Sequence, residues 1–71
     1  PVYPQAADLS MEQINVITRT LEPGQKERAR HIALLAQKVQ SLLSITPKDN
    51  NPEKFLTTVL RDYQYYALEE I

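Results

Sequence analysis

The sequence predicts an all-α fold, a small up-down-up three-helix bundle with an extended N-terminal lead-in. Apolar residues recur at spacings of three and four, and capping residues and prolines divide the chain into three segments. No stretch alternates apolar and polar residues in the way that a half-buried strand would. A chain of 71 residues can bury one core. Short connections between helices favour antiparallel neighbours.

The domain is expected to span residues 8–71, preceded by an irregular lead-in over residues 1–7. Pro1 and Pro4 fix their own φ angles and oppose a regular element at this end of the chain. The sequence begins with proline rather than methionine, so we expect it to be a fragment of a larger protein.

The first helix is expected over about residues 10–22. Ser10 and Gln13 have the spacing of a capping box, in which each side chain bonds the backbone N–H of the other residue. Pro23 and Gly24 then interrupt the helix, because proline disfavours a helical residue before it and glycine permits a left-handed turn. The apolar stripe of this helix contains Met11, Ile14, Ile17 and Leu21.

The second and third helices are expected over about residues 24–45 and 52–68, with a surface loop at 46–51. Asn51 and Pro52 form a start signal for the third helix, since asparagine is a favoured cap and proline is favoured in the first turn. The apolar stripe of the second helix contains Ile32, Leu35, Val39, Leu42 and Ile45. That of the third helix contains Phe55, Leu56, Val59, Leu60, Tyr63, Tyr66 and Ala67.

Three of the four tyrosines fall close together in the third helix. Helical spacing places Tyr63 and Tyr66 at the buried edge and leaves Tyr65 facing outward. One interpretation is that the buried pair packs at the margin of the core, with hydroxyls reaching water or a carbonyl. The alternative is that Tyr65, Tyr66 and Tyr3 form a contact patch, because tyrosine is enriched at protein interfaces.

The charge balance argues against a general nucleic-acid binder. Eight Lys and Arg residues against nine Asp and Glu residues leave a net charge of −1, so no overall field attracts a polyanion. A weak contact with nucleic acid or an anionic surface through Lys26 and Arg30 is kept as a further alternative, since these residues share one side of the expected helix. No apolar run reaches the roughly 18 residues of a membrane span.

The residue types needed for catalysis or metal binding are scarce. The chain has no cysteine, one glycine and a single histidine, His31, which lies among charged residues. A metal site needs three or four ligands, and a phosphate-binding loop needs several glycines. We therefore expect no catalytic residue, no cofactor, no metal and no enzymatic activity. The absence of cysteine favours a cytoplasmic location, but exported bacterial domains also lack cysteine, so the location stays open.

One stretch resembles a known family. In ARHIALLAQKVQSLLSITPKDNNPEKFLTTVL, residues 29–60, an apolar helix is followed by a proline-containing link, by Phe55 and Leu56, and then by another leucine. This pattern resembles the C-terminal part of the bromochloroindolyl-phosphate hydrolysis (XpaC-like) family of bacterial proteins. The residues after Leu56 depart from the aromatic residues and Leu-Pro step usual in that family. The resemblance implies a helical bacterial protein that could lie at a membrane surface, and it transfers no catalytic residue to this chain.

The leading functional hypothesis is a non-catalytic helical interaction or assembly module that binds a protein partner or forms a homo-oligomer. Three short helices carry more apolar residues than one small core readily covers, and uncovered apolar surface marks interfaces. These surplus positions are Val16, Leu34, Leu43, Leu68 and Ile71. The expected contact residues are Leu34, Tyr65, Tyr66 and Leu68. The alternative is an accessory helical part of a phosphate-ester hydrolase-like or membrane-peripheral protein.

Overall fold

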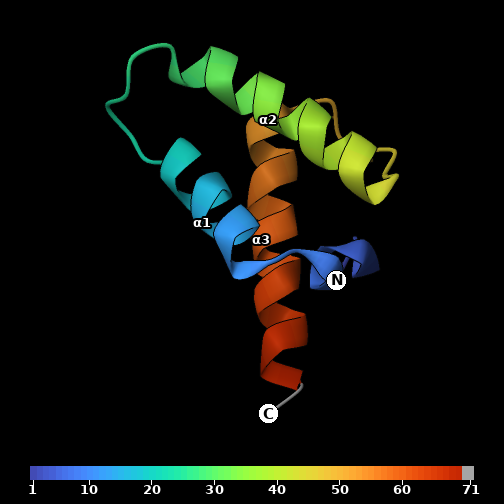
Figure 1. Ribbon diagram of the computed structural model, residues 1–71. Helices are drawn as coiled ribbons and strands as arrows, with labels where there is room; N and C mark the ends of the chain where they lie inside the picture. Colours follow the sequence, from blue (N-terminus) through green and yellow to red (C-terminus); the bar gives the residue numbers. More distant parts are fainter. Residues whose placement is uncertain (70–71) are drawn as a thin grey trace.

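The computed structural model describes residues 1–69, which fold into three α-helices and one short 3-10 helix (Figure 1). In chain order these are η1 (Pro4–Asp8), α1 (Met11–Thr20), α2 (Arg28–Leu43) and α3 (Pro52–Glu69). No strand occurs among residues 1–69. The prediction of a small all-α fold with three helices is confirmed.

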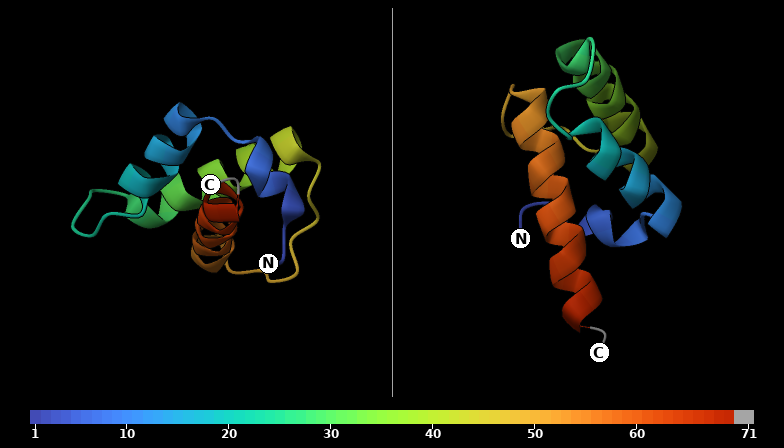
Figure 2. Two further views of the ribbon diagram at one scale, coloured as in Figure 1. Left: turned by 90° about the horizontal axis from the view of Figure 1, so that it is seen from below. Right: turned by 90° about the vertical axis from the view of Figure 1, so that its left-hand side faces the viewer.

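The helices are not all antiparallel to their neighbours. α1 and α2 run in opposite directions, as an up-down course requires, but α3 crosses α2 steeply and runs in the same general direction (Figures 1 and 2). The long loop over residues 44–51 carries the chain back along α2. As a result α3 begins beside the start of α2, where the Arg28 Nη1 and Glu53 Oε1 atoms lie 3.0 Å apart.

The start of α1 follows the predicted capping box. The Ser10 hydroxyl accepts the backbone N–H of Gln13 at 3.1 Å, and the Gln13 side chain accepts the backbone N–H of Ser10 at 2.8 Å. Both bonds satisfy donors that have no partner within the helix. The start of α3 is also as predicted, because the Asn51 side chain accepts the N–H of Lys54 at 3.2 Å.

α2 begins at Arg28, later than the start near residue 24 that the sequence predicted. Gly24 takes the left-handed backbone with φ of 83°. The residues that follow bond the end of α1 instead of starting a new helix: the Gln25 amide donates to the Arg19 carbonyl at 2.6 Å, and the Arg28 guanidinium donates to the Leu21 carbonyl at 2.7 Å. These bonds satisfy carbonyls that the last turn of α1 leaves without partners.

α2 also ends earlier than expected, at Leu43. Ser44 adopts the left-handed conformation with φ of 55°, and the backbone N–H of Ile45 bonds the Gln40 carbonyl at 2.9 Å. This is the bond of a Schellman-type helix end, in which an apolar residue after the cap turns back towards the helix. Ile45 is accordingly buried, although it lies outside the helix.

The N-terminal segment is part of the core, which differs from the expected irregular lead-in over residues 1–7. Tyr3, Ala6 and Leu9 are all buried, at a spacing of three that matches the three residues per turn of a 3-10 helix. The Tyr3 ring packs edge-on against Phe55, with ring centroids 5.3 Å apart. The rest of the buried apolar core comprises Ile14, Ile17, Ile32, Ala36, Val39, Ile45, Leu56 and Val59.

A buried aspartate in the middle of α3 holds this segment in place. Asp62 is 1% exposed, and its Oδ2 accepts the backbone N–H groups of Val2 at 2.8 Å and Tyr3 at 2.7 Å. Its Oδ1 has no hydrogen bond among the described residues and lies 3.5 Å from the Arg61 guanidinium. A second polar bond holds the same segment, because the Tyr3 hydroxyl accepts the backbone N–H of Lys48 at 3.0 Å.

Arg28 and Glu53 join the first turns of α2 and α3 through a two-point ion pair. The two guanidinium nitrogens of Arg28 donate to the two carboxylate oxygens of Glu53 at 3.0 and 3.2 Å. These hydrogen bonds, with the attraction between the charges, lower the pKa of Glu53 from its ordinary value of 4.5 and raise the pKa of Arg28. The Glu53 side chain is 51% exposed and that of Arg28 is 28% exposed, so solvent screens the pair, and it orients the two helices more than it stabilises them.

Replacing Glu53 by glutamine is expected to remove a small stabilisation that depends on pH. The folded-state pKa of Glu53 is lowered, so the pair stabilises the fold above the ordinary pKa of 4.5 and loses this effect as the pH falls through the lower folded value. The difference in free energy of unfolding between wild type and Glu53→Gln should therefore shrink in acid. Urea titrations from neutral pH towards about pH 2 measure it.

The matched control is Glu12→Gln, an exposed position whose side chain forms no ion pair in the part of the chain that the structure describes. Its effect should not follow the same pH profile. A difference for Glu53→Gln that stays constant down to the most acidic condition would contradict the role given to the pair.

Candidate functional site

In the part of the chain that the structure describes, no set of side chains with evident catalytic chemistry comes together. Among residues 1–69, no group of three or more His, Cys, Asp and Glu side chains could hold a metal ion. The single histidine, His31, is exposed on α2. The surface features with a bearing on function are therefore hollows and exposed apolar side chains.

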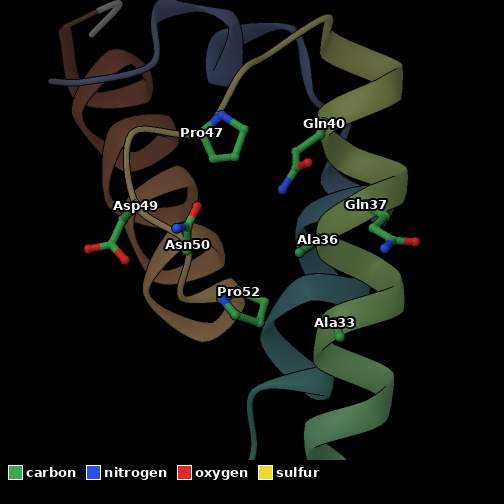
Figure 3. Close-up of a pocket in the computed structure, with 8 residues that line it drawn as sticks. All are labelled: Ala33, Ala36, Gln37, Gln40, Pro47, Asp49, Asn50 and Pro52. Atoms are coloured by element: carbon green, nitrogen blue, oxygen red, sulfur yellow. The ribbon is translucent and has the colours of Figure 1, made fainter.

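A hollow of about 270 Å³ lies between α2 and the loop that precedes α3 (Figure 3). Its walls are mostly small, since Ala33 and Ala36 line one side and prolines the other. Gln40 extends into the gap, whereas Gln37 and Asp49 point away from it (Figure 3). The Asp49 carboxylate accepts the N–H of Asn51 at 2.9 Å and pairs with Lys54, and these contacts lower its pKa. The hollow thus lacks the convergent polar groups of a small-molecule site.

A second hollow of about 180 Å³, which we name the α1–α2 groove, runs between these two helices. It is lined almost entirely by apolar side chains, with one amide and one ammonium at its rim. The lining residues are Leu9, Gln13, Val16, Ile17, Leu35, Lys38, Val39 and Leu42. Val16 is 48% exposed and Leu42 is 59% exposed, so apolar surface stands open to solvent here.

The apolar surface continues from the groove onto the outer face of α2. Leu34, which is 48% exposed, lines an adjoining hollow that shares Lys38 with the groove. Leu34, Lys38 and Leu42 are four residues apart in turn, so they form one stripe along the helix. We name this the outer stripe of α2. No acidic residue occurs between Arg28 and Leu43, so the stripe is apolar and basic.

A third feature is the C-terminal part of α3, which projects beyond the other elements (Figures 1 and 2). We name residues 65–68 the α3 tip. Tyr65 is 44% exposed and Leu68 is 71% exposed. The rings of Tyr65 and Tyr66 meet edge to face with centroids 5.2 Å apart. One turn earlier, the Tyr63 hydroxyl donates to the Met11 sulfur at 3.2 Å.

The four predicted contact residues fall on two separate surfaces. Leu34 lies on the outer stripe of α2, and Tyr65, Tyr66 and Leu68 lie on the α3 tip. Tyr63 and Tyr66 are half-buried and Tyr65 is exposed, as the helical spacing predicts. Tyr3, however, belongs to the core and cannot join a tyrosine patch. Ile71, one of the surplus apolar positions, lies outside the described residues.

Sequence analysis placed three exposed residues on the core-facing stripes, namely Met11, Leu42 and Ala67. Leu42 and Met11 continue the apolar stripes of their helices, yet they are 59% and 64% exposed. Both lie near the ends of helices and are only partly covered; the contact on Met11 is that of the Tyr63 hydroxyl with its sulfur. The missed signal is that apolar residues in α2 occupy both sides of the helix, with Leu34 and Leu35 adjacent. A stripe this wide exceeds what one small core covers.

The expected pairing of Lys26 and Arg30 on one helical face does not occur. Lys26 precedes α2 and is exposed in the turn before it. Arg30 lies on the helix and pairs with Glu27 at 3.4 Å. Of the three lysine and arginine residues on α2, Lys38 is the one that lines the groove.

The fold and its surfaces define a small all-α domain with uncovered apolar faces. Within the described chain, no helix has the length and apolar character needed to cross a membrane. The whole chain, residues 1–71, matches the family described as "Domain of unknown function (DUF8484)", and the protein belongs to this family. No curated protein and no solved structure matches it. None of these comparisons bears on the resemblance to the XpaC-like family.

Proposed function

We propose that this domain is a non-catalytic assembly module that associates with further copies of itself. The observation that supports the proposal is the α1–α2 groove with its continuation on the outer stripe of α2. Val16, Leu34 and Leu42 are each about half exposed or more, on adjoining parts of one surface. Leaving such side chains in water has no structural benefit within a single copy, and contiguous apolar surface marks interfaces.

The expected association is weak to moderate. Covering a leucine or valine side chain completely contributes about 1.5–3 kcal/mol, and these side chains are already partly covered. Bringing two proteins together costs an estimated 4–15 kcal/mol in lost freedom of motion. The groove alone therefore barely offsets the cost, and a further surface must contribute. With that further surface included, we expect a dissociation constant between about 1 µM and 1 mM, which corresponds to a net free energy of about −8 to −4 kcal/mol.

Sedimentation of the wild-type domain is expected to show a mass that rises above the 8.2 kDa of one chain. The concentration should span about 10 µM to about 1 mM, the range in which such contacts form. The double variant Leu34→Gln/Leu42→Gln should sediment as a monomer, because it removes two apolar contacts without disturbing the core. Glutamine is a good helix former, so α2 should persist.

The matched control is Thr57→Gln, at an exposed position on α3 that lines none of these hollows. It should associate like wild type, and circular dichroism should show the same helix content for all three proteins. A wild-type domain that stays monomeric up to about 1 mM would overturn the proposal.

The non-catalytic part of the proposal has a separate test. Incubation of the domain with a chromogenic phosphate ester is expected to give no turnover above that of buffer alone. Turnover that follows the domain through purification would contradict it and would favour the hydrolase-like alternative.

A further inference from the structure

We infer that the copies join head to tail, with the α3 tip of one copy seated in the α1–α2 groove of the next. This inference rests on the proposed self-association and specifies its geometry. The two surfaces lie on different elements and differ in shape, since one is a hollow and the other is the projecting end of a helix (Figures 1 and 2). A contact between them covers both apolar surfaces at once.

A symmetric contact between two grooves is less favourable. The outer stripe of α2 has Lys38 at its centre, between Leu34 and Leu42. If this stripe packed antiparallel against its own copy about that centre, the two Lys38 ammonium groups would lie side by side. Like charges brought together in an interface are destabilising. Such a dimer would also leave Tyr65 and Leu68 of both copies in water.

The charges of the two surfaces are complementary. Residues 11–43, which include α1 and α2, contain five basic and three acidic residues, for a formal charge of +2. The whole chain carries −1, so the remaining residues carry −3. No lysine or arginine follows Arg61 in the sequence, whereas Glu69 and Glu70 do. The tip itself is uncharged and two glutamates follow it directly in the sequence, whereas the apolar groove has the basic Lys38 at its rim.

The shape of the tip fits a groove between two helices. Tyr65 and Leu68 are three residues apart, so their exposed side chains lie on one face of α3. An apolar helical face laid into an apolar groove is a common mode of recognition between proteins. The aromatic ring and the leucine supply two anchors, and tyrosine is among the residues that contribute most to interfaces.

This geometry makes the contact heterologous, so each copy offers one groove and one tip. Contacts of this kind form rings when the rotation between copies closes, and open chains when it does not. A symmetric dimer, in contrast, stops at two copies. The two arrangements therefore differ in how defective copies behave when they are mixed.

The test is a mixing experiment with two variants that each lack one surface. The groove variant is Leu34→Gln/Leu42→Gln, and the tip variant is Tyr65→Gln/Leu68→Gln. Each variant alone is expected to remain monomeric, because every contact it could form lacks one half. An equal mixture should form a 1:1 dimer, since the intact tip of one variant fits the intact groove of the other. That dimer cannot grow, so its mass stays at twice 8.2 kDa at every higher concentration.

The outcomes separate the inference from the proposed function. If wild type associates but the mixture stays monomeric, or if the tip variant associates as strongly as wild type, the head-to-tail geometry is overturned and self-association stands. If wild type itself is monomeric throughout, self-association is overturned as well. If circular dichroism shows that the double tip variant has lost helix, the single variant Leu68→Gln is used instead, because Leu68 is 71% exposed.

Discussion

Replacing Tyr3 by alanine is expected to lower the free energy of unfolding by about 3–5 kcal/mol. The ring is 5% exposed and packs edge-on against Phe55 at 5.3 Å, so its removal leaves a cavity beside α3. The loss of the hydroxyl also leaves the Lys48 N–H without its acceptor. A single core of this size rarely provides more than about 3–5 kcal/mol, so most molecules of this variant should be unfolded. Urea denaturation followed by circular dichroism measures the change.

Two controls show whether the effect comes from burial of the ring. Tyr65→Ala makes the same substitution at a position that is 44% exposed, and it should cost less than about 1 kcal/mol. Tyr3→Phe keeps the ring and removes only the hydroxyl, so it should cost about 1 kcal/mol and remain measurable where Tyr3→Ala does not fold. Equal effects for Tyr3→Ala and Tyr65→Ala would mean that the N-terminal segment is not part of the core.

Replacing Asp62 by alanine is expected to lower the free energy of unfolding by about 2–4 kcal/mol. Its carboxylate accepts two backbone N–H groups of the N-terminal segment, at 2.7 and 2.8 Å. Alanine leaves both donors without an acceptor, and the one on Tyr3 lies in a buried bond that water does not readily replace. Thermal or urea unfolding of the variant measures the loss.

The conservative variant Asp62→Asn keeps one side-chain oxygen that can accept both N–H groups. It should cost less than Asp62→Ala because both N–H groups keep an acceptor. It should still be less stable than wild type, since it loses the charge and hydrogen bonds to a charged group are the stronger ones. Hydrogen exchange of the Val2 and Tyr3 amides gives an independent readout, with faster exchange in the alanine variant. An alanine variant as stable as wild type, with unchanged exchange, would rule out the anchoring role of Asp62.

The predictable parts of this fold are those set by short stretches of chain. The capping box at Ser10 and the asparagine cap at Asn51 depend on residues three positions apart, so sequence analysis located both helix starts. The start of α2 was misplaced because Gln25 and Arg28 bond carbonyls at the end of α1, those of Arg19 and Leu21. These bonds can form only after the turn between α1 and α2 has folded, so the local sequence pattern does not show that they prevent an earlier helix start.

The contribution of the N-terminal segment to the core could not be predicted from the local sequence pattern. Two prolines there suggest irregular backbone, and nothing nearby in the sequence marks Tyr3 and Ala6 as core residues. Their partner Asp62 lies 59 residues away from Tyr3 and reads as an ordinary polar position on α3. Only the folded chain brings a carboxylate beside two backbone N–H groups, and burial then makes that contact strong.

The candidate surfaces were also predictable only in part: the sequence was enough to name their residues but not to show how these residues are arranged. Counting apolar positions along the helices was enough to predict an excess of them and to name Leu34, Tyr65, Tyr66 and Leu68. Whether these residues share a surface depends on how the helices cross, because the crossing of α3 over α2 sends the α3 tip away from the groove (Figure 1). By itself, therefore, the sequence determined the helices, their caps and the surplus of apolar side chains, all of which follow from local spacing. The tertiary structure alone decided which of those side chains are covered and which surfaces they form, because coverage depends on contacts between segments distant in the chain.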